Sequence, residues 1–297
     1  MNARPVPPAK VVALLPAWNA EAFIVPVLES LAAQTYRNLE VLVSDDASTD
    51  RTHEICATFA ARHENFRLIR QPTNLGWIGN VNALLRHAEG DCFFFAFHDD
   101  VLRPTYVERL AEALANNPRA VLAFSDMIRR VVGPPHDAAL PATPAPESIK
   151  VYLDLDGVDD RVRRSVAVAR KWGKSPSYTV TLANRGLFRA SAARAIGGLR
   201  AHFAGEFGAD WPWLLRLSML GEFVRVPEPL VEKSYRRTSL SATWRYSLWQ
   251  RMGALTACMR ETRRARLPLA EELTIHRALI GSALKRQWWG FKTRRRS

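Results

Sequence analysis

Short apolar runs alternate with amphipathic segments along the first half of the chain. Between the runs, apolar residues recur at helical spacing, as in residues 23–31, and Pro104 stands where the first turn of another helix is expected. The runs themselves are apolar without alternation, which is typical of parallel strands that helices cover on both faces. We therefore predict an α/β fold with a mostly parallel central sheet. The predicted strands are 11–16, 39–44, 66–70, 93–97 and 120–125.

The second half of the chain is less regular. A stretch rich in proline and alanine, 133–148, separates it from the first half. After this stretch the pattern predicts a cationic helix or loop, a strand with a short helix that ends at a Gly-Gly pair, a further helix and an extended segment. These elements correspond to 161–174, 186–199, 209–221 and 222–231. From Thr243 onward the pattern is mostly helical.

Charge is distributed unevenly along the sequence. The 297 residues carry a net charge of +13. The last 65 of them, from Lys233 to Ser297, contain 16 basic and 3 acidic side chains, which accounts for the whole excess. The chain is therefore a neutral body with a basic C-terminal extension, and a partner that charge selects should meet the extension.

The final segment, LKRQWWGFKTRRRS, places tryptophan beside basic residues. Such a composition suits the headgroup region of a membrane, where each cation near an anionic surface adds about 1 kcal/mol. An anionic membrane surface is therefore one partner that the segment predicts. A disordered basic end, or a helix whose tryptophans pack on the body, explains it equally well. A nucleic-acid partner is not expected, because no recognised nucleic-acid module accompanies the charge.

The sequence also bears on localisation. Its three cysteines are far apart and have no metal-ligand spacing, which is typical of reduced thiols in a cytoplasm. The start, MNARPVPPAK, has no apolar core of a signal peptide, and no stretch approaches the roughly 20 apolar residues of a membrane span. We expect a cytoplasmic protein whose extension can bind the inner membrane face peripherally.

Two pairs of acids stand where predicted strands meet loops. Asp45 and Asp46 follow the second strand, and Asp99 and Asp100 follow the fourth, at the end of the run DCFFFAFHDD. Open α/β sheets bind ligands at the carboxyl ends of their strands, and adjacent carboxylates are tolerated best beside a cation. The pattern favours Mg²⁺ or Mn²⁺ shared with a diphosphate over zinc, which prefers Cys and His ligands. Solvated turn acids are the alternative explanation.

The first acid pair lies in a longer motif, VVALLPAWNAEAFIVPVLESLAAQTYRNLEVLVSDDASTDRT. The motif joins an apolar strand, Pro-x-aromatic-Asn, a helix, Q-T-Y-x-N-x-E, a second strand and DD-x-S-T-D. It resembles the opening of family 2 glycosyltransferases, which have the GT-A fold. Shorter matches follow in the family's order, namely NLG, AEGD, HDDVLRP, GLFRASAARAIGGL, ADWPWLLRLSMLGEF and VPEPLVEKSYRR. The resemblance covers about 11–237.

The resemblance implies a division of the chain. Residues 1–237 would form the GT-A domain, with a Rossmann-like nucleotide-sugar-binding half over 10–127 and an acceptor half over 128–237. Residues 238–297 would form a basic helical extension. Acceptor contacts are expected from 133–174, where several cations hint at an anionic acceptor such as a lipid-linked diphosphate glycan. A solvated helix face is the simpler explanation of those cations.

The resemblance also implies donor-binding roles. Asp46 would accept a hydrogen bond from the imide N–H of uracil or thymine, and Trp18 would pack on that base. Asp100 would bind the metal ion, and Asp99 would face the sugar or the ribose. The other donor-binding residues that the family motifs imply are Pro16, Asn19, Arg236 and Arg237.

Asp210 aligns with the family's general base at a helix start, and Glu206 is a backup base. The position also suits a simple helix N-cap. Trp211 and Trp213 beside it fit either a sugar-binding wall or the core. The sequence departs from the family pattern at three positions that usually hold an acid, an acid and a histidine, and these are Phe97, Ala209 and Thr238.

With these roles the resemblance implies an inverting, metal-dependent glycosyltransferase. It would move a sugar from a UDP- or dTDP-sugar to a hydroxyl of a glycan or lipid-linked acceptor in cell-surface polysaccharide synthesis. Mn²⁺ or Mg²⁺ on Asp100 would stabilise the leaving diphosphate, and Asp210 would take the acceptor's proton. A non-catalytic sugar-nucleotide- or glycan-binding protein on the same fold is the alternative. The three departures favour that alternative, and the retained acids oppose it.

Overall fold

The computed structural model describes residues 9–131, 160–171, 183–235 and 247–294. Its strands are β1 (Val11–Ala17), β2 (Leu39–Asp45), β3 (Phe66–Arg70), β4 (Cys92–Phe95), β5 (Asp100–Leu102), β6 (Ala120–Val131), β7 (Leu187–Arg189) and β8 (Glu222–Tyr235). Its α-helices are α1 (Ile24–Ala32), α2 (Thr52–Arg62), α3 (Gly76–His87), α4 (Tyr106–Asn116), α5 (Arg161–Lys171), α6 (Ala190–Ile196), α7 (Asp210–Ser218), α9 (Leu248–Arg264) and α10 (Leu269–Arg294). A single 3₁₀ turn, Ala183–Arg185, precedes β7 among these described elements.

The described strands form one mixed sheet in the order β3-β2-β1-β4-β7-β6-β8-β5. The first four in this order run parallel, and β6 runs parallel to β8. β7 is antiparallel to both neighbours, and the edge strand β5 is antiparallel to β8. The predicted α/β fold with a mostly parallel sheet is confirmed.

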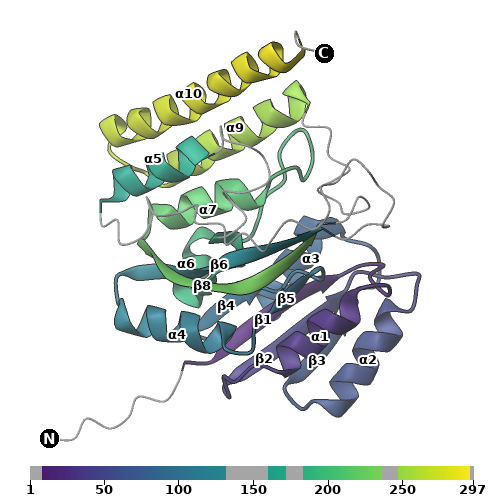
Figure 1. The fold of residues 1–297 in the computed structure, drawn as a ribbon. Coiled ribbons are helices and arrows are strands. Elements are labelled where there is room, and N and C mark those ends of the chain that lie inside the picture. Colours follow the sequence, from purple (N-terminus) through teal and green to yellow (C-terminus); the bar gives the residue numbers. More distant parts are fainter. Residues whose placement is uncertain (1–8, 132–159, 172–182, 236–246, 295–297) are drawn as a thin grey trace, which may run out of the picture.

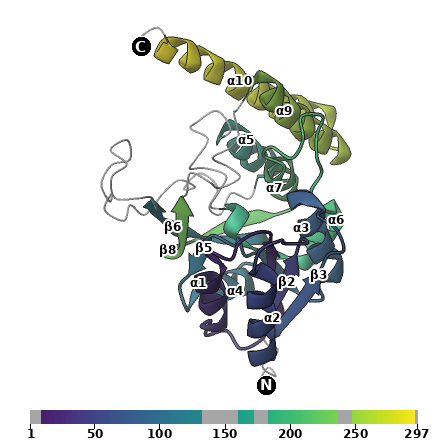
Figure 2. The same ribbon diagram turned by 90° about the vertical axis from the view of Figure 1, so that its right-hand side faces the viewer.

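Helices cover both faces of the sheet. Figures 1 and 2 show α1, α2 and α4 on one face and α3, α6 and α7 on the other. All seven side chains of β1 are buried, as are six of the seven in β2. This burial explains why the strand sequences are apolar without alternation, because neither face of these strands meets water.

The C-terminal part of the chain is helical, as its pattern predicts. It adds a helical layer, formed by α5, α9 and α10, above α7 (Figure 1). Within this layer α10 packs on α5 and α9, and both of these pack on α7. Among the described helices, none combines the length and the apolar composition that crossing a membrane would require.

The strand order places a topological switch point at the carboxyl end of β1. The chain goes from β1 to β2 on one side, whereas β4 joins β1 on the other side after a crossover through α3. β1 and β4 stay in register only up to Leu14 and Phe95, but β1 and β2 remain paired to Ala17 and Asp45. A topological switch point of this kind is the usual ligand site of an open α/β sheet.

Candidate active site

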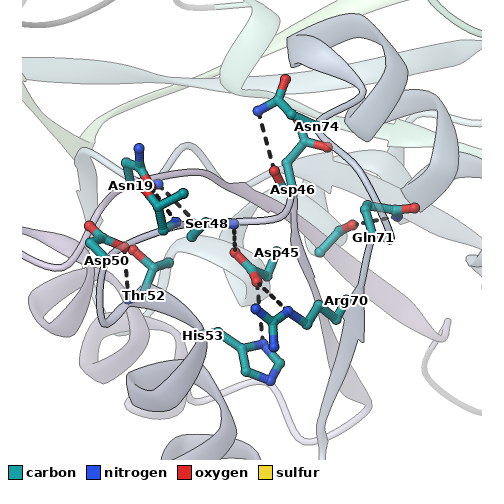
Figure 3. Close-up of polar contacts among 12 residues, drawn as sticks. Asn19, Asp45, Asp46, Ser48, Asp50, Thr52, His53, Arg70, Gln71 and Asn74 are labelled. Carbon is teal, nitrogen blue, oxygen red and sulfur yellow. Dashed lines mark hydrogen bonds and ion pairs between the residues drawn. The ribbon is translucent and has the colours of Figure 1, made fainter.

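Hydrogen bonds join the loop after β1 to the loop after β2 (Figure 3). The amide of Asn19 donates to Ser48 Oγ at 3.0 Å, and the amide of Thr49 donates to Asn19 Oδ1 at 2.9 Å. Asn19 has a φ of 45°, a left-handed conformation that asparagine adopts more readily than most residues. These contacts explain the pairing of the sequence motifs around Asn19 and Ser48, since each loop supplies the other's hydrogen-bond partners.

Asp45 holds the second loop from beneath. Its buried carboxylate accepts a hydrogen bond from the Ser48 amide at 3.2 Å. The other oxygen lies 3.3 Å from His53 Nδ1 and 3.7 Å from Arg70 Nε, as Figure 3 shows. The first acid of the Asp45–Asp46 pair therefore positions the loop and is not available to a ligand.

Asp46 lies at the start of α3. Its Oδ1 accepts a hydrogen bond from the Leu75 amide at 2.8 Å. Its backbone carbonyl accepts one from Asn74 Nδ2 at 3.2 Å, as Figure 3 shows. Burial raises the pKa of Asp46, while the amides of Leu75 and Gly76 act in the opposite direction. The helix start thus fixes the orientation of this carboxylate near the carboxyl end of β1.

The aromatic residue of the first loop lies in the open. Trp18 follows β1 directly, and 52% of its surface is exposed. Pro16 is buried in β1, and its carbonyl lies 3.2 Å from Nδ1 of His98. An exposed indole at the carboxyl end of a central strand is suited to stacking on a flat ring.

Asp99 and Asp100 lie in a cluster of charges. Asp100 begins β5 and faces Lys233 of β8 in the antiparallel register. Lys233 Nζ is 3.8 Å from Asp100 Oδ1 and 3.9 Å from Asp99 Oδ2. Asp100 Oδ2 also accepts a hydrogen bond from Nε of Arg185. We call Asp99, Asp100, Arg185 and Lys233 the charge cluster. Both cations are buried, which requires paired anions nearby.

Phe97 has a role in this cluster. The guanidinium carbon of Arg185 lies 4.5 Å from the centre of the Phe97 ring. The hydroxyl of Tyr106 donates to the backbone carbonyl of Arg185 and fixes its main chain. The chain thus has an aromatic ring where the family pattern has an acid, and this ring supports a cation through a cation–π contact.

Asp210 begins α7 and lies near the charge cluster. Its Oδ2 accepts a hydrogen bond from Asn184 Nδ2 at 2.9 Å. Burial raises the pKa of Asp210, whereas Arg185 and Lys233 are close enough to lower it. The structure therefore brings the predicted base and the predicted metal ligand to the same two cations. No side-chain cap of α7 accompanies it, because the N-cap residue is Ala209.

The tryptophans beside Asp210 belong to the core. Both Trp211 and Trp213 are buried. Trp213 packs edge-on against Phe188 at 4.9 Å, and its Nε1 donates to the Gly197 carbonyl at 3.1 Å. Of the two predicted interpretations, a sugar-binding wall and a core position, the structure supports the core position.

Glu206 is engaged at the other end of the same segment. Its Oε1 accepts a hydrogen bond from the amide of Ile78 at 3.0 Å, in the first turn of α3. A side chain at position 76 would crowd this carboxylate, because its Cβ atom would lie only 3.1 Å from Glu206 Oε1. The carboxylate of Glu206 thus closes the helix start that also holds Asp46.

The cations that the structure supplies differ from those that the sequence suggests. Arg236 and Arg237 lie outside the described residues. Arg185 and Lys233 were missed, since one stands in a short turn and the other in an extended strand. The available signal was a charged residue inside an apolar strand, as in EPLVEKSY, because such a residue needs a buried partner.

The carboxylates of the cluster fit a divalent cation. Asp100 Oδ1 is buried and accepts no hydrogen bond within the described residues. That part of the chain has no group of three or more His, Cys, Asp or Glu side chains suited to a metal. Mg²⁺ and related ions often need only one or two carboxylates, with waters and phosphate oxygens completing the shell. Asp100 with Asp99 meets this requirement, and Arg185 and Lys233 compete for the same oxygens.

Residues 13–145 match the family model described as Glycosyl transferase family 2. This matched region belongs to glycosyl transferase family 2. The matched region contains Asp46, Asp99 and Asp100, and it ends before Asp210. The match thus covers the acids predicted to bind the donor and the metal, whereas the predicted base lies beyond it.

One curated relative is glycosyltransferase GlyA of Streptococcus pneumoniae serotype 4. It is 34% identical over 101 residues, which is 34% of this chain and 14% of GlyA. The family 2 chain therefore spans a small part of that relative's length.

Solved structures confirm the fold that the resemblance predicts. The complex of S. aureus TarS 1–349 with UDP-GlcNAc has a TM-score of 0.69 and 17% identity, covering 92% of this chain and 72% of that one. The mannosyltransferase PcManGT of Pyrobaculum calidifontis, in complex with GDP-Man and Mn²⁺, has a TM-score of 0.52 and 17% identity. The structural match covers 93% of this chain and 74% of PcManGT.

Proposed function

We propose that the protein is an inverting glycosyltransferase that uses a nucleoside-diphosphate sugar and an acceptor hydroxyl. The observation that carries the proposal is the placement of Asp210 beside the charge cluster at the carboxyl edge of the sheet. Family 2 membership of residues 13–145 and the TarS-like fold support it. A glycan or lipid-linked acceptor in cell-surface polysaccharide synthesis remains our proposal for the second substrate.

The donor's base would lie between Trp18 and Asp46. The exposed indole provides a stacking surface, and the fixed carboxylate provides an acceptor for an imide N–H. This pairing supports UDP or dTDP as the nucleotide. TarS was solved with UDP-GlcNAc, whereas PcManGT was solved with GDP-Man, so the fold alone leaves the base open.

Asp46→Asn should lower the affinity for UDP about tenfold, because an amide group replaces the carboxylate that accepts the imide proton. The asparagine oxygen can still accept the Leu75 amide, so α3 keeps its start. Isothermal titration with UDP, dTDP and GDP measures the effect. Asp91→Asn is the matched control, because the Asp91 carboxylate accepts a hydrogen bond from the Lys10 amide before β1 and has no predicted part in donor binding. Equal affinities of both variants for UDP would remove Asp46 from base recognition.

The diphosphate would lie over the charge cluster. Arg185 and Lys233 can balance the negative charge that grows on the leaving group as the glycosidic bond breaks. A divalent cation held by Asp100 and Asp99 would supply further electrostatic stabilisation of that charge. The Mn²⁺ in PcManGT supports this part of the proposal.

Asp210 would act as the general base. The carboxylate can accept the proton of the acceptor hydroxyl while the hydroxyl oxygen attacks the anomeric carbon from the face opposite the diphosphate. One displacement of this kind inverts the configuration and requires no covalent nucleophile. Asn184 orients the carboxylate by donating to Oδ2.

The pH dependence of turnover follows from the raised pKa of Asp210. The base must be ionised, so the acid limb of the profile should lie above the pH range of an ordinary aspartate. Lys233→Met removes a cation that lowers this pKa, so the limb should move to still higher pH. Profiles of turnover against pH for both proteins measure the shift. An unchanged limb in Lys233→Met would mean that Asp210 does not set it.

A non-catalytic sugar-nucleotide-binding protein is the competing function. Ala209 and Thr238, which replace polar residues of the family pattern, favour it. The role of Phe97 beneath Arg185 removes one of its supports. A donor-hydrolysis assay with Mn²⁺ separates the two functions, because slow release of the nucleotide requires the catalytic arrangement and simple binding does not.

A further inference from the structure

Helix α10 carries apolar side chains on its buried side and also along one strip of its exposed side. Its inner side chains, including Ile275 and Leu279, are fully buried against the rest of the helical layer. Its outer side carries four large aliphatic residues that we call the outer stripe. The stripe consists of Leu269 (70% exposed), Leu273 (44%), Ile280 (41%) and Leu284 (59%).

The stripe follows the geometry of the helix. Its members are separated by four, seven and four residues, which places them on one side over more than four turns. The described side chains of α10 end at Leu284, so the stripe extends to the limit of what the structure describes.

The position of α10 leaves the stripe without cover. Figures 1 and 2 show α10 as the outermost helix of the helical layer, with α5 and α9 on its inner side. Contiguous exposed apolar surface on a protein of this kind marks a contact with a partner or a membrane. The stripe therefore requires an occupant.

The charge around the stripe selects the occupant. All three acids of residues 233–297 are paired with arginines, and the pairs are Glu261–Arg264, Glu271–Arg161 and Glu272–Arg263. The exposed residues Arg260, Arg266 and Arg277 make no ion pair within the described part of the chain. Arg277 lies between Leu273 and Ile280 in the sequence and on the same side of α10.

We propose that α10 lies flat on an anionic lipid surface, with the outer stripe inserted among the headgroups and Arg277 beside the phosphates. Apolar side chains with cations at their edge are the requirements of an interfacial helix. A second copy of the chain would bring two surfaces of the same positive charge together, whereas anionic lipid neutralises them. The interaction does not depend on the proposed function, and it rests on the described side chains of α10.

The test is flotation of the full chain with vesicles of phosphatidylcholine, with or without phosphatidylglycerol. The chain should bind the anionic vesicles at low salt and lose affinity as salt rises. Leu273→Gln should weaken this binding about fivefold to tenfold, because an apolar side chain no longer leaves water. Leu220→Gln is the matched control, since Leu220 is 43% exposed in the turn after α7, and its binding should equal the wild type. Arg277→Gln should weaken binding to anionic vesicles about fivefold.

Three results would overturn the proposal. The first is a full chain that ignores anionic vesicles at low salt. The second is unchanged binding of Leu273→Gln, which would assign the interaction to the basic end alone. The third is a dimer in dilute solution that Leu273→Gln, but not Leu220→Gln, converts to a monomer, since a second copy would then cover the stripe. Thermal unfolding of each variant establishes that the fold is retained.

Discussion

Replacing Asp210 by asparagine is expected to lower turnover by about a hundredfold or more and to leave donor affinity nearly unchanged. The substitution is close to isosteric, and the side-chain oxygen can still accept the hydrogen bond from Asn184. The amide cannot take a proton, so the acceptor hydroxyl must attack without general-base assistance. Steady-state turnover with a nucleotide sugar, together with titration of the nucleotide alone, measures the two quantities separately.

Glu206→Gln is the control for this experiment. The glutamine oxygen can still accept the Ile78 amide at the start of α3, so turnover should remain within a few-fold of the wild type. A normal rate in Asp210→Asn and a large loss in Glu206→Gln would reverse the assignment of the base. Loss of nucleotide binding in Asp210→Asn would show that this aspartate supports the structure of α7 and not the chemistry.

Replacing Asp100 by asparagine is expected to remove the stimulation of turnover by Mn²⁺ and to destabilise the protein by about 3 kcal/mol. The neutral amide binds a divalent cation much more weakly than the carboxylate does, and it leaves the buried Arg185 and Lys233 with less negative charge to neutralise them. Turnover and UDP affinity, each with and without Mn²⁺, measure the first consequence, and denaturant unfolding measures the second.

Asp99→Asn is the comparison for the loss of stability expected of Asp100→Asn. Asp99 is less buried, and its contact with Lys233 is long, at 3.9 Å, so the stability loss should stay below about 1 kcal/mol. If Asp100→Asn loses stability but keeps its full response to Mn²⁺, the cation is held elsewhere. If the wild type shows no Mn²⁺ response in turnover or UDP affinity, Arg185 and Lys233 neutralise the diphosphate without a metal.

The elements that sequence predicts well here are those whose local pattern agrees with their burial. β1 and β2 read as strands because nearly every side chain in them is buried on one face or the other. Pro26 is compatible with α1 because it falls in the first turn, where its missing N–H is not needed. The short strand β5 was not predicted, since three residues after an acid pair carry too little pattern.

The donor side of the candidate site could be predicted because its residues lie in one continuous motif. Asp46 and Asn19 belong to two loops that are joined by hydrogen bonds, and both loops lie within the motif. Arg185 and Lys233 could not be predicted, because each meets Asp100 only through sheet pairing between distant segments. In the sequence, Phe97 stands where the family pattern has an acid, which suggests a lost polar group. The structure explains the phenylalanine, because its ring contacts the guanidinium of Arg185.

The strand order also bears on where an independently folding unit can end. The family match stops at 145, yet β5 joins the sheet only through β8, and β6 joins it through β7 and β8. Both partner strands come from beyond the match, at Leu187–Arg189 and Glu222–Tyr235. A fragment cut at the family boundary would therefore leave β5 and β6 without their partner strands and separate Asp100 from its cations. The smallest autonomous unit of this enzyme fold must extend through β8.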